Sequence, residues 1–196
     1  MILWFRNLPP KNMDFSEWKP FIRNAWCRKH FMKFVYLLMV GIFVAPSIFG
    51  DPSFSKMIGQ TFDVHLNNSQ VSSVITYLLI TLVIVCIFII HEILHIIVIF
   101  KQDDISLTHS GIFFWLNTNA ILSKKLFWLF ISLPVMILSA VPGIASIYFT
   151  GNLKAVMLFI CWVNLIISSS DIINSLLILI KPNKTVYCRG YYRTKS

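Results

Sequence analysis

Three ionisable side chains lie close together inside an apolar stretch of this chain. His91, Glu92 and His95 fall within residues 85–100, and all the remaining residues of this range are apolar. On a helix, residues four apart share one face, so the two imidazoles can bind one zinc ion and the carboxylate beside them can act as a base. An ionisable group at the centre of a bilayer costs about 2.5–3.5 kcal/mol. We therefore interpret the three residues as a metal site and not as a chance match.

A third ligand is needed, because a catalytic zinc ion takes three protein ligands and keeps its fourth position for water. Asp171 is the leading candidate, and it lies ten residues before Lys181, where its own apolar stretch ends. The two histidines lie ten and six residues before Lys101, which ends theirs. At ~1.5 Å per residue, all three side chains lie about 9–15 Å from the same membrane face. The alternative for Asp171 is a carboxylate that only pairs across helices.

Other polar side chains could complete or support such a site. His109, Asp103 and Asp104, in the segment between two apolar stretches, are the alternative ligands. Asn164 and Ser168 lie seven and three residues before Asp171, on the same face of a continuous helix. We expect them to hold that carboxylate or a substrate carbonyl by hydrogen bonds, unless Asn164 merely bonds between helices.

The composition is that of an integral membrane protein of one domain. Apolar residues make up 57% of the chain and charged residues only 13%, against about a quarter charged in soluble proteins. The net charge of +9 would suit nucleic acid, but seven of the 17 Lys and Arg precede Phe34 and five follow Ile180. Basic blocks beside apolar stretches are typical of cytoplasmic loops in contact with anionic lipid. We therefore expect a lipid bilayer with anionic lipid as partner, and no nucleic acid.

Four apolar stretches must position the candidate site. We predict transmembrane helices at residues 34–50, 71–100, 126–149 and 155–180, the third of them bent or broken by its prolines. The number of Lys and Arg residues is alternately high and low in successive connections. Because cytoplasmic connections carry the excess of Lys and Arg, this alternation predicts that both termini lie in the cytoplasm. Residues 1–33 are then a cytoplasmic or interfacial segment, and residues 181–196 a cytoplasmic tail.

The connections carry weaker patterns. Aromatic residues at helical spacing in residues 13–28, including Phe15, Trp18 and Trp26, predict an amphipathic interfacial helix, or one packed against the protein. Residues 51–70 read as a loop. A polar turn at Gly111 predicts a short β-hairpin within residues 101–125. The predicted fold class is an all-α integral membrane protein of about four transmembrane helices, with this possible hairpin between the second and third.

At these residues the chain resembles known families. His91-Glu92-x-x-His95, followed two segments later by Asn164-x6-Asp171, resembles the intramembrane zinc proteases related to site-2 protease. The chain is more closely similar, over residues 71–185, to a small bacterial family of zincin peptidases of unknown function. That family has a Pro-containing span and a Ser/Gly-rich segment before its Asp, as at Pro134 and residues 168–171 here. Site-2 proteases carry proline and glycine around their Asp, where this chain has serines.

The resemblance implies one zinc ion bound by His91, His95 and Asp171, with Glu92 as the catalytic base. We expect an intramembrane zinc metalloprotease that cleaves a membrane-associated protein or peptide in a bacterial cell membrane. The segment 102–118 would present a sheet edge to an extended substrate. Two alternatives stay open: a non-catalytic zinc-binding membrane protein that acts as an immunity or partner-binding factor, and an ion or proton transporter, which the absence of a visible internal repeat disfavours.

Overall fold

The computed structural model describes residues 2–5, 15–49, 59, 61–62, 69–103, 105–110 and 113–194, and most of these residues are helical. Three helices are long and apolar enough to cross a membrane, namely Ala25–Ile48, Gln70–Ile99 and Lys124–Ala145. The pair Gly151–Ile167 and Ser169–Leu179 adds a fourth if it is one broken span. These helices agree with a membrane protein. Most of the predicted 51–70 loop lies outside the described residues.

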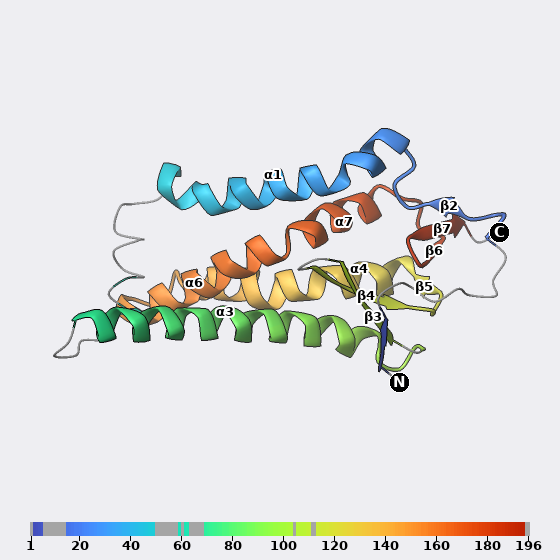
Figure 1. Cartoon of the computed structure of the whole chain (residues 1–196). Coiled ribbons are helices and arrows are strands. Elements are labelled where there is room, and N and C mark those ends of the chain that lie inside the picture. The colour runs from blue at the N-terminus through green and yellow to red at the C-terminus, as the bar shows by residue number, and fades with distance from the viewer. Residues whose placement is uncertain are drawn as a thin grey trace. The chain divides into compact units, whose positions relative to one another are not determined.

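The chain divides into two compact units, and each is assembled from segments far apart in the sequence. The first comprises Met1–Met32, Glu92–Leu133 and Asp171–Ser196, and the second comprises Lys33–His91 and Pro134–Ser170. Helix α3, Ser69–Ile99, runs through both units as one continuous helix (Figure 1). It agrees with the predicted span 71–100 and contains neither proline nor glycine, so nothing in its sequence interrupts the backbone hydrogen bonds.

In the second unit, α3 packs against α6, Gly151–Ile167. The contact is a buried apolar cluster of Ile87, Phe159 and Val163. Ile87 lies one turn before His91 and Val163 is directly followed by Asn164. The apolar packing of these two helices therefore sets His91 opposite Asn164.

Helix α1, Ala25–Phe49, is longer than the predicted span 34–50 and contains Pro46. Proline has no N–H, so the carbonyl of Ile42, four residues earlier, lacks its usual helical donor. The indole Nε1 of Trp162 on α6 donates to that carbonyl at 3.0 Å, and the rings of Phe43 and Trp162 stack with centroids 5.6 Å apart. A helix proline thus creates the acceptor by which α1 is bonded to α6.

The third predicted span, 126–149, is a compound helix. It consists of α4, Lys124–Val135, a π-helix η1, Met136–Ala140, and α5, Val141–Ala145. The Val141 N–H bonds the carbonyl of Met136, five residues back. The irregularity predicted from the prolines is therefore a change to wider π-helical turns that begins two residues after Pro134, at Met136.

The predicted single helix 155–180 is wrong, because the chain bends by 68° between α6 and α7, Ser169–Leu179. The hydroxyl of Ser169 donates back to the carbonyl groups of Leu165, at 3.3 Å, and Ile166, at 2.9 Å. Serine hydroxyls that bond the preceding turn compete with helical hydrogen bonds and bend helices. As a consequence Asn164 and Asp171 belong to different helices, and the shared face that a seven-residue spacing predicted does not exist.

The predicted helix over residues 13–28 is also wrong for residues 15–24. Helix α1 begins only at Ala25, where the Oδ1 of Asn24 accepts the N–H groups of Trp26, at 2.8 Å, and Cys27, at 3.1 Å. The preceding residues include the short strand β2, Lys19–Pro20. Pro20 lies inside the predicted helix, and a proline in a helix interior removes one backbone hydrogen bond. The apolar periodicity alone did not reveal this.

The C-terminal residues 181–196, predicted to be a tail, contain a folded hairpin. Strands β6, Thr185–Cys188, and β7, Tyr191–Thr194, pair antiparallel within a sheet of order β2-β7-β6-β5, where β5 is Leu122–Ser123. Trp18, from the predicted interfacial helix, packs in a buried cluster with Val186 and Cys188. Of the two environments predicted for this segment, lipid and protein, Trp18 therefore has the protein one.

The predicted hairpin in residues 101–125 is confirmed. Strand β3, Ile105–Ser110, pairs antiparallel with β4, Phe113–Thr118, and β1, Ile2–Phe5, adds to β3 in parallel. Residues 108–110, predicted as part of the turn, lie in β3, and the predicted turn residue Gly111 lies outside the described residues. The expectation of an all-α fold is thus wrong where the two small sheets form, both of them in the first unit.

Candidate metal centre

His95, in the first unit, is held by a backbone carbonyl. Its Nδ1 lies 2.6 Å from the carbonyl oxygen of Phe130 on α4. A carbonyl oxygen only accepts hydrogen bonds, so Nδ1 is the donor and carries the proton. In the neutral ring Nε2 is then the nitrogen with the electron pair, and it faces Asp171, whose Oδ2 lies 3.4 Å away. Both side chains are largely buried, at 8% and 14% exposure.

His91, in the second unit, is held by a side-chain amide. Its Nδ1 lies 3.0 Å from the Oδ1 of Asn164, which is fully buried. The Nδ2 of that amide donates to the carbonyl of Pro134, at 3.1 Å, and to the Oγ of Ser139, at 2.7 Å. Because the Pro134 carbonyl accepts only, the amide orientation is fixed and its oxygen must accept from His91. The Oγ of Ser168 lies 3.4 Å from the same Nδ1.

The two histidines stand on consecutive turns of one continuous helix, and Asp171 joins them through its contact with His95. One ligand atom from each of the three residues lies within 4.8 Å of the other two. Two ligands of a tetrahedral zinc ion are about 3.3 Å apart, given Zn–N and Zn–O bonds of about 2.0–2.2 Å. The pair at 3.4 Å already has this separation. With both Nδ1 atoms committed as donors, this set of side chains fits a zinc ion.

The structure thus brings together the three predicted ligands, but their roles as ligands remain predictions. The predicted supporting residues Asn164 and Ser168 both lie beside His91, at 3.0 and 3.4 Å from its Nδ1. Their predicted role of holding the carboxylate of Asp171 or a substrate carbonyl stays a prediction. Among the alternative ligands, Asp103 is exposed and does not belong to the group. Asp104 and the side chain of His109 lie outside the described part of the chain.

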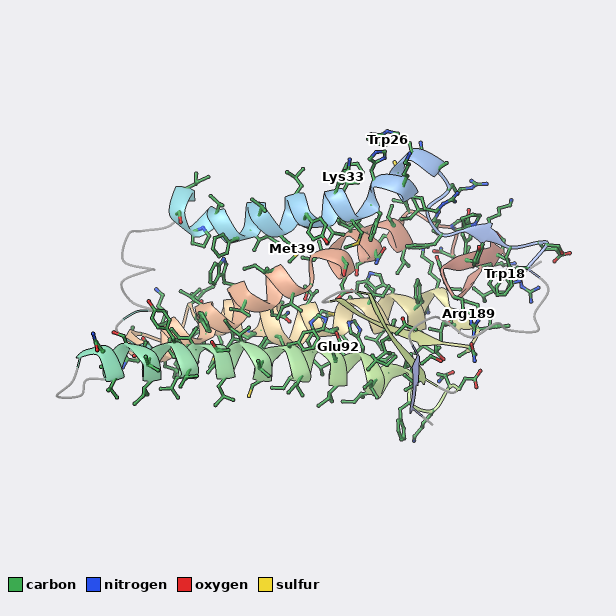
Figure 2. All side chains as sticks on the ribbon, in the orientation of Figure 1. Trp18, Trp26, Lys33, Met39, Glu92 and Arg189 are labelled. Carbon is green, nitrogen blue, oxygen red and sulfur yellow. The ribbon has the colours of Figure 1, made fainter. Side chains whose placement is uncertain are left out.

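Glu92 follows His91 directly on α3, where Figure 2 labels it, and its side chain is half-buried. It therefore lies on the helix that carries both histidines, at the position that the His-Glu-x-x-His spacing gives a general base. Its catalytic role remains a prediction.

Sequence reasoning missed the groups that hold the two imidazoles, namely the Phe130 carbonyl, the Pro134 carbonyl and the Ser139 hydroxyl. One signal was present, because a proline inside an apolar helix leaves the carbonyl four residues earlier without a donor. For Pro134 that carbonyl belongs to Phe130. Which side chain would take it was not readable from the sequence.

Fold and site together define a membrane protein with a buried His-His-Asp group able to bind a metal ion. Residues 84–187, more than half of the chain, match the family described as "Putative zincin peptidase", and the protein belongs to that family. The matched range includes both histidines, Glu92 and Asp171. Comparison with curated proteins and with solved structures found no match. The family supports a metallopeptidase in general terms and zinc as its metal.

Proposed function

We propose that this protein is an intramembrane zinc metallopeptidase that hydrolyses a peptide bond of a membrane-associated protein or peptide. The observation that carries the proposal is the approach of Asp171 to the Nε2 of His95, 3.4 Å from it. The Nδ1 atoms of both histidines are bound to acceptors on other helices. Zinc-binding histidines in proteins characteristically donate their second nitrogen to a carbonyl or carboxylate in this way.

His91, His95 and Asp171 would hold the ion, and Glu92 would move the proton. A bound zinc ion polarises a peptide carbonyl and makes water acidic enough to lose a proton near neutral pH. The Glu92 carboxylate accepts one proton from the attacking water as its oxygen bonds to the carbonyl carbon. It then gives this proton to the nitrogen of the breaking C–N bond. The products are a carboxylic acid and an amine, and Glu92 returns to its ionised form.

The number of ligands favours catalysis over a structural role for the metal. Structural zinc sites use four protein ligands, whereas catalytic ones use three and leave a position open. In the described part of the chain, the group comprises three such residues. A non-catalytic zinc protein would need a fourth.

The partners in this proposal are a peptide substrate and the bilayer. In the sheet of order β1-β3-β4, strand β4 forms one edge, and an extended peptide would add there by main-chain hydrogen bonds. Lys101 and Lys125 are exposed, and they lie two residues after the end of α3 and at the second residue of α4, respectively. Anionic headgroups would lie at these helix ends. We place the protein in a bacterial cell membrane with both termini in the cytoplasm.

Glu92→Gln tests the proposal, with Glu17→Gln, at an exposed position, as the matched control. Each variant and the wild type are expressed in cells, and membrane peptides are compared by mass spectrometry. Zinc per chain is measured on the purified proteins. We expect Glu92→Gln to retain zinc and to lose the cleavage products that wild type and Glu17→Gln generate. Purified wild type without stoichiometric zinc, or identical peptides from wild type and Glu92→Gln, would overturn the proposal.

A further inference from the structure

We propose that Pro134 is a positioning residue that sets the orientation of both histidines. Its missing N–H leaves the Phe130 carbonyl to His95, and its own carbonyl holds the Asn164 amide that binds His91. The inference rests on the proposed metal site and deepens it. It assigns to residue 134 the choice of the nitrogen that each imidazole presents to the metal. At His95 this acts through the N–H that proline lacks, and at His91 through the backbone carbonyl.

The first half of the proposal concerns His95. In an α-helix the carbonyl of residue 130 receives the N–H of residue 134, and proline at 134 cannot donate. Both residues lie within α4, Lys124–Val135. The Nδ1 of His95 occupies this acceptor at 2.6 Å, and its ring lies against that of Phe130, with centroids 4.9 Å apart. An ordinary residue at 134 would supply an N–H that competes with His95 for the same oxygen.

The second half concerns His91. Pro134 is fully buried, with under 2% exposure, at the point where α4 gives way to the π-helix η1. Its carbonyl and the hydroxyl of Ser139, which lies in η1, both accept from the amide nitrogen of Asn164. Ser139 in turn donates to the carbonyl of Cys161, at 3.4 Å. The amide therefore cannot turn over without placing its oxygen against the Pro134 carbonyl.

The consequence is that both rings carry their proton on Nδ1 and present Nε2 to the metal. Partners that fix the orientation and tautomer of a ligating histidine typically contribute 10–100-fold in metal affinity. A proline that acts through them should therefore matter for metal binding more than for folding. Such a residue favours one tautomer of each histidine without touching the metal.

A matched control stands elsewhere in the chain. Pro46 in α1 likewise leaves a carbonyl, that of Ile42, which takes a side-chain N–H from Trp162. This bond joins Ile42 and Trp162, and none of His91, His95 and Asp171 takes part in it. Pro46→Ala thus makes the same chemical change as Pro134→Ala, away from the histidines.

The experiment measures Zn²⁺ affinity by competition with a chromophoric chelator, and thermal unfolding of the apo proteins in detergent. A helix interior accommodates alanine better than proline, so Pro134→Ala should unfold at the same or a higher temperature than the wild type. We expect its Zn²⁺ dissociation constant to rise about 10–100-fold. Pro46→Ala should bind Zn²⁺ as wild type does. Equal affinity of Pro134→Ala and wild type would overturn the inference.

Two further variants keep the test decisive if Pro134→Ala folds poorly. Asn164→Leu removes the acceptor of His91 and should weaken Zn²⁺ binding about 10–100-fold. Ser139→Ala removes one of the two amide acceptors and leaves the Pro134 carbonyl, so its affinity should stay within about threefold of wild type. Equal losses in the two variants would assign the role to Ser139 and overturn the inference.

A second measurement needs no metal. The ¹⁵N chemical shifts of His91 and His95 in the apo protein report which ring nitrogen holds the proton. We expect Nδ1–H in the wild type and a mixture of tautomers at His95 in Pro134→Ala. Unchanged shifts at both rings in Pro134→Ala would count against the inference. Failure of the wild type to bind zinc would instead contradict the proposed function.

Discussion

The Oδ2 of Asp171 and the Nε2 of His95 lie 3.4 Å apart, although the two residues are 76 positions apart in the sequence (171 − 95). Both residues belong to the first unit, Asp171 on α7 and His95 on α3. The nitrogen that faces the carboxylate is the one left by the Nδ1–H bond to Phe130. The contact therefore joins two groups that are both suited to one metal ion.

We expect Asp171→Asn to weaken Zn²⁺ binding by at least 10-fold, because a neutral amide oxygen replaces a charged ligand. Metal content of the purified protein and chelator competition check this. Asp103→Asn is the control, since Asp103 is an exposed carboxylate and was an alternative ligand in the sequence. A larger loss in Asp103→Asn than in Asp171→Asn would move the third ligand to the segment after α3.

Metal removal should destabilise the protein, because an ion that binds only the folded state stabilises it by mass action. At a free zinc concentration 100 times the dissociation constant, this contribution is about 2.7 kcal/mol. Thermal unfolding in detergent, with zinc and after chelation, should show a lower midpoint without metal. His95→Ala should abolish the difference. His30→Ala is the control, because His30 lies on α1 with its Nδ1 bonded to the carbonyl oxygen of Trp26. This variant should keep the difference between the two midpoints.

Lys124 is expected to stabilise the end of α7. Its Nζ donates to the carbonyl oxygens of Leu179 and Lys181, at 3.2 and 2.5 Å, and to the Oδ1 of Asn183, at 3.3 Å. The last carbonyls of a helix have no donors within it. Lys124→Met should therefore lower the free energy of unfolding by about 1.5–3 kcal/mol. The neighbouring exposed Lys125 provides the control, and equal midpoints for Lys124→Met and Lys125→Met would contradict the prediction.

Trp162→Phe keeps an aromatic ring beside Phe43 but removes the N–H that Ile42 accepts. A buried carbonyl left without a donor costs about 1–3 kcal/mol. We expect a lower unfolding midpoint for this variant than for Trp26→Phe, which changes a Trp that is 60% exposed. Adding Pro46→Ala should recover stability, since an alanine N–H can then donate to the Ile42 carbonyl. No recovery in the double variant would disprove this account of the bond.

Local patterns predicted the parts that local chemistry decides. The spacing of His91 and His95 needs only the geometry of one helix, and residues 71–100 are apolar enough to form it as α3, Ser69–Ile99. The equal depths counted from Lys101 and Lys181 paired Asp171 with these histidines before any packing was known. The segment around Gly111 gave the hairpin, because strand alternation and turn residues are also local.

Other predictions were wrong where one pattern has two physical outcomes. An apolar helix face, as in residues 13–28, packs equally well on lipid or on protein, and only the C-terminal strands decided that Trp18 is buried. The serines from Ser168 onward allow either a straight helix or the observed bend of 68°.

The sequence by itself determined which residues could bind a metal and that a proline in the third apolar stretch would leave one carbonyl without a donor. Only the tertiary structure decided that His95 takes this carbonyl and that Asn164 holds His91. The physical reason is that a freed acceptor is a local property of the backbone, fixed by Pro134 alone. Its donor, by contrast, is whichever side chain the packing of other helices brings within about 3 Å.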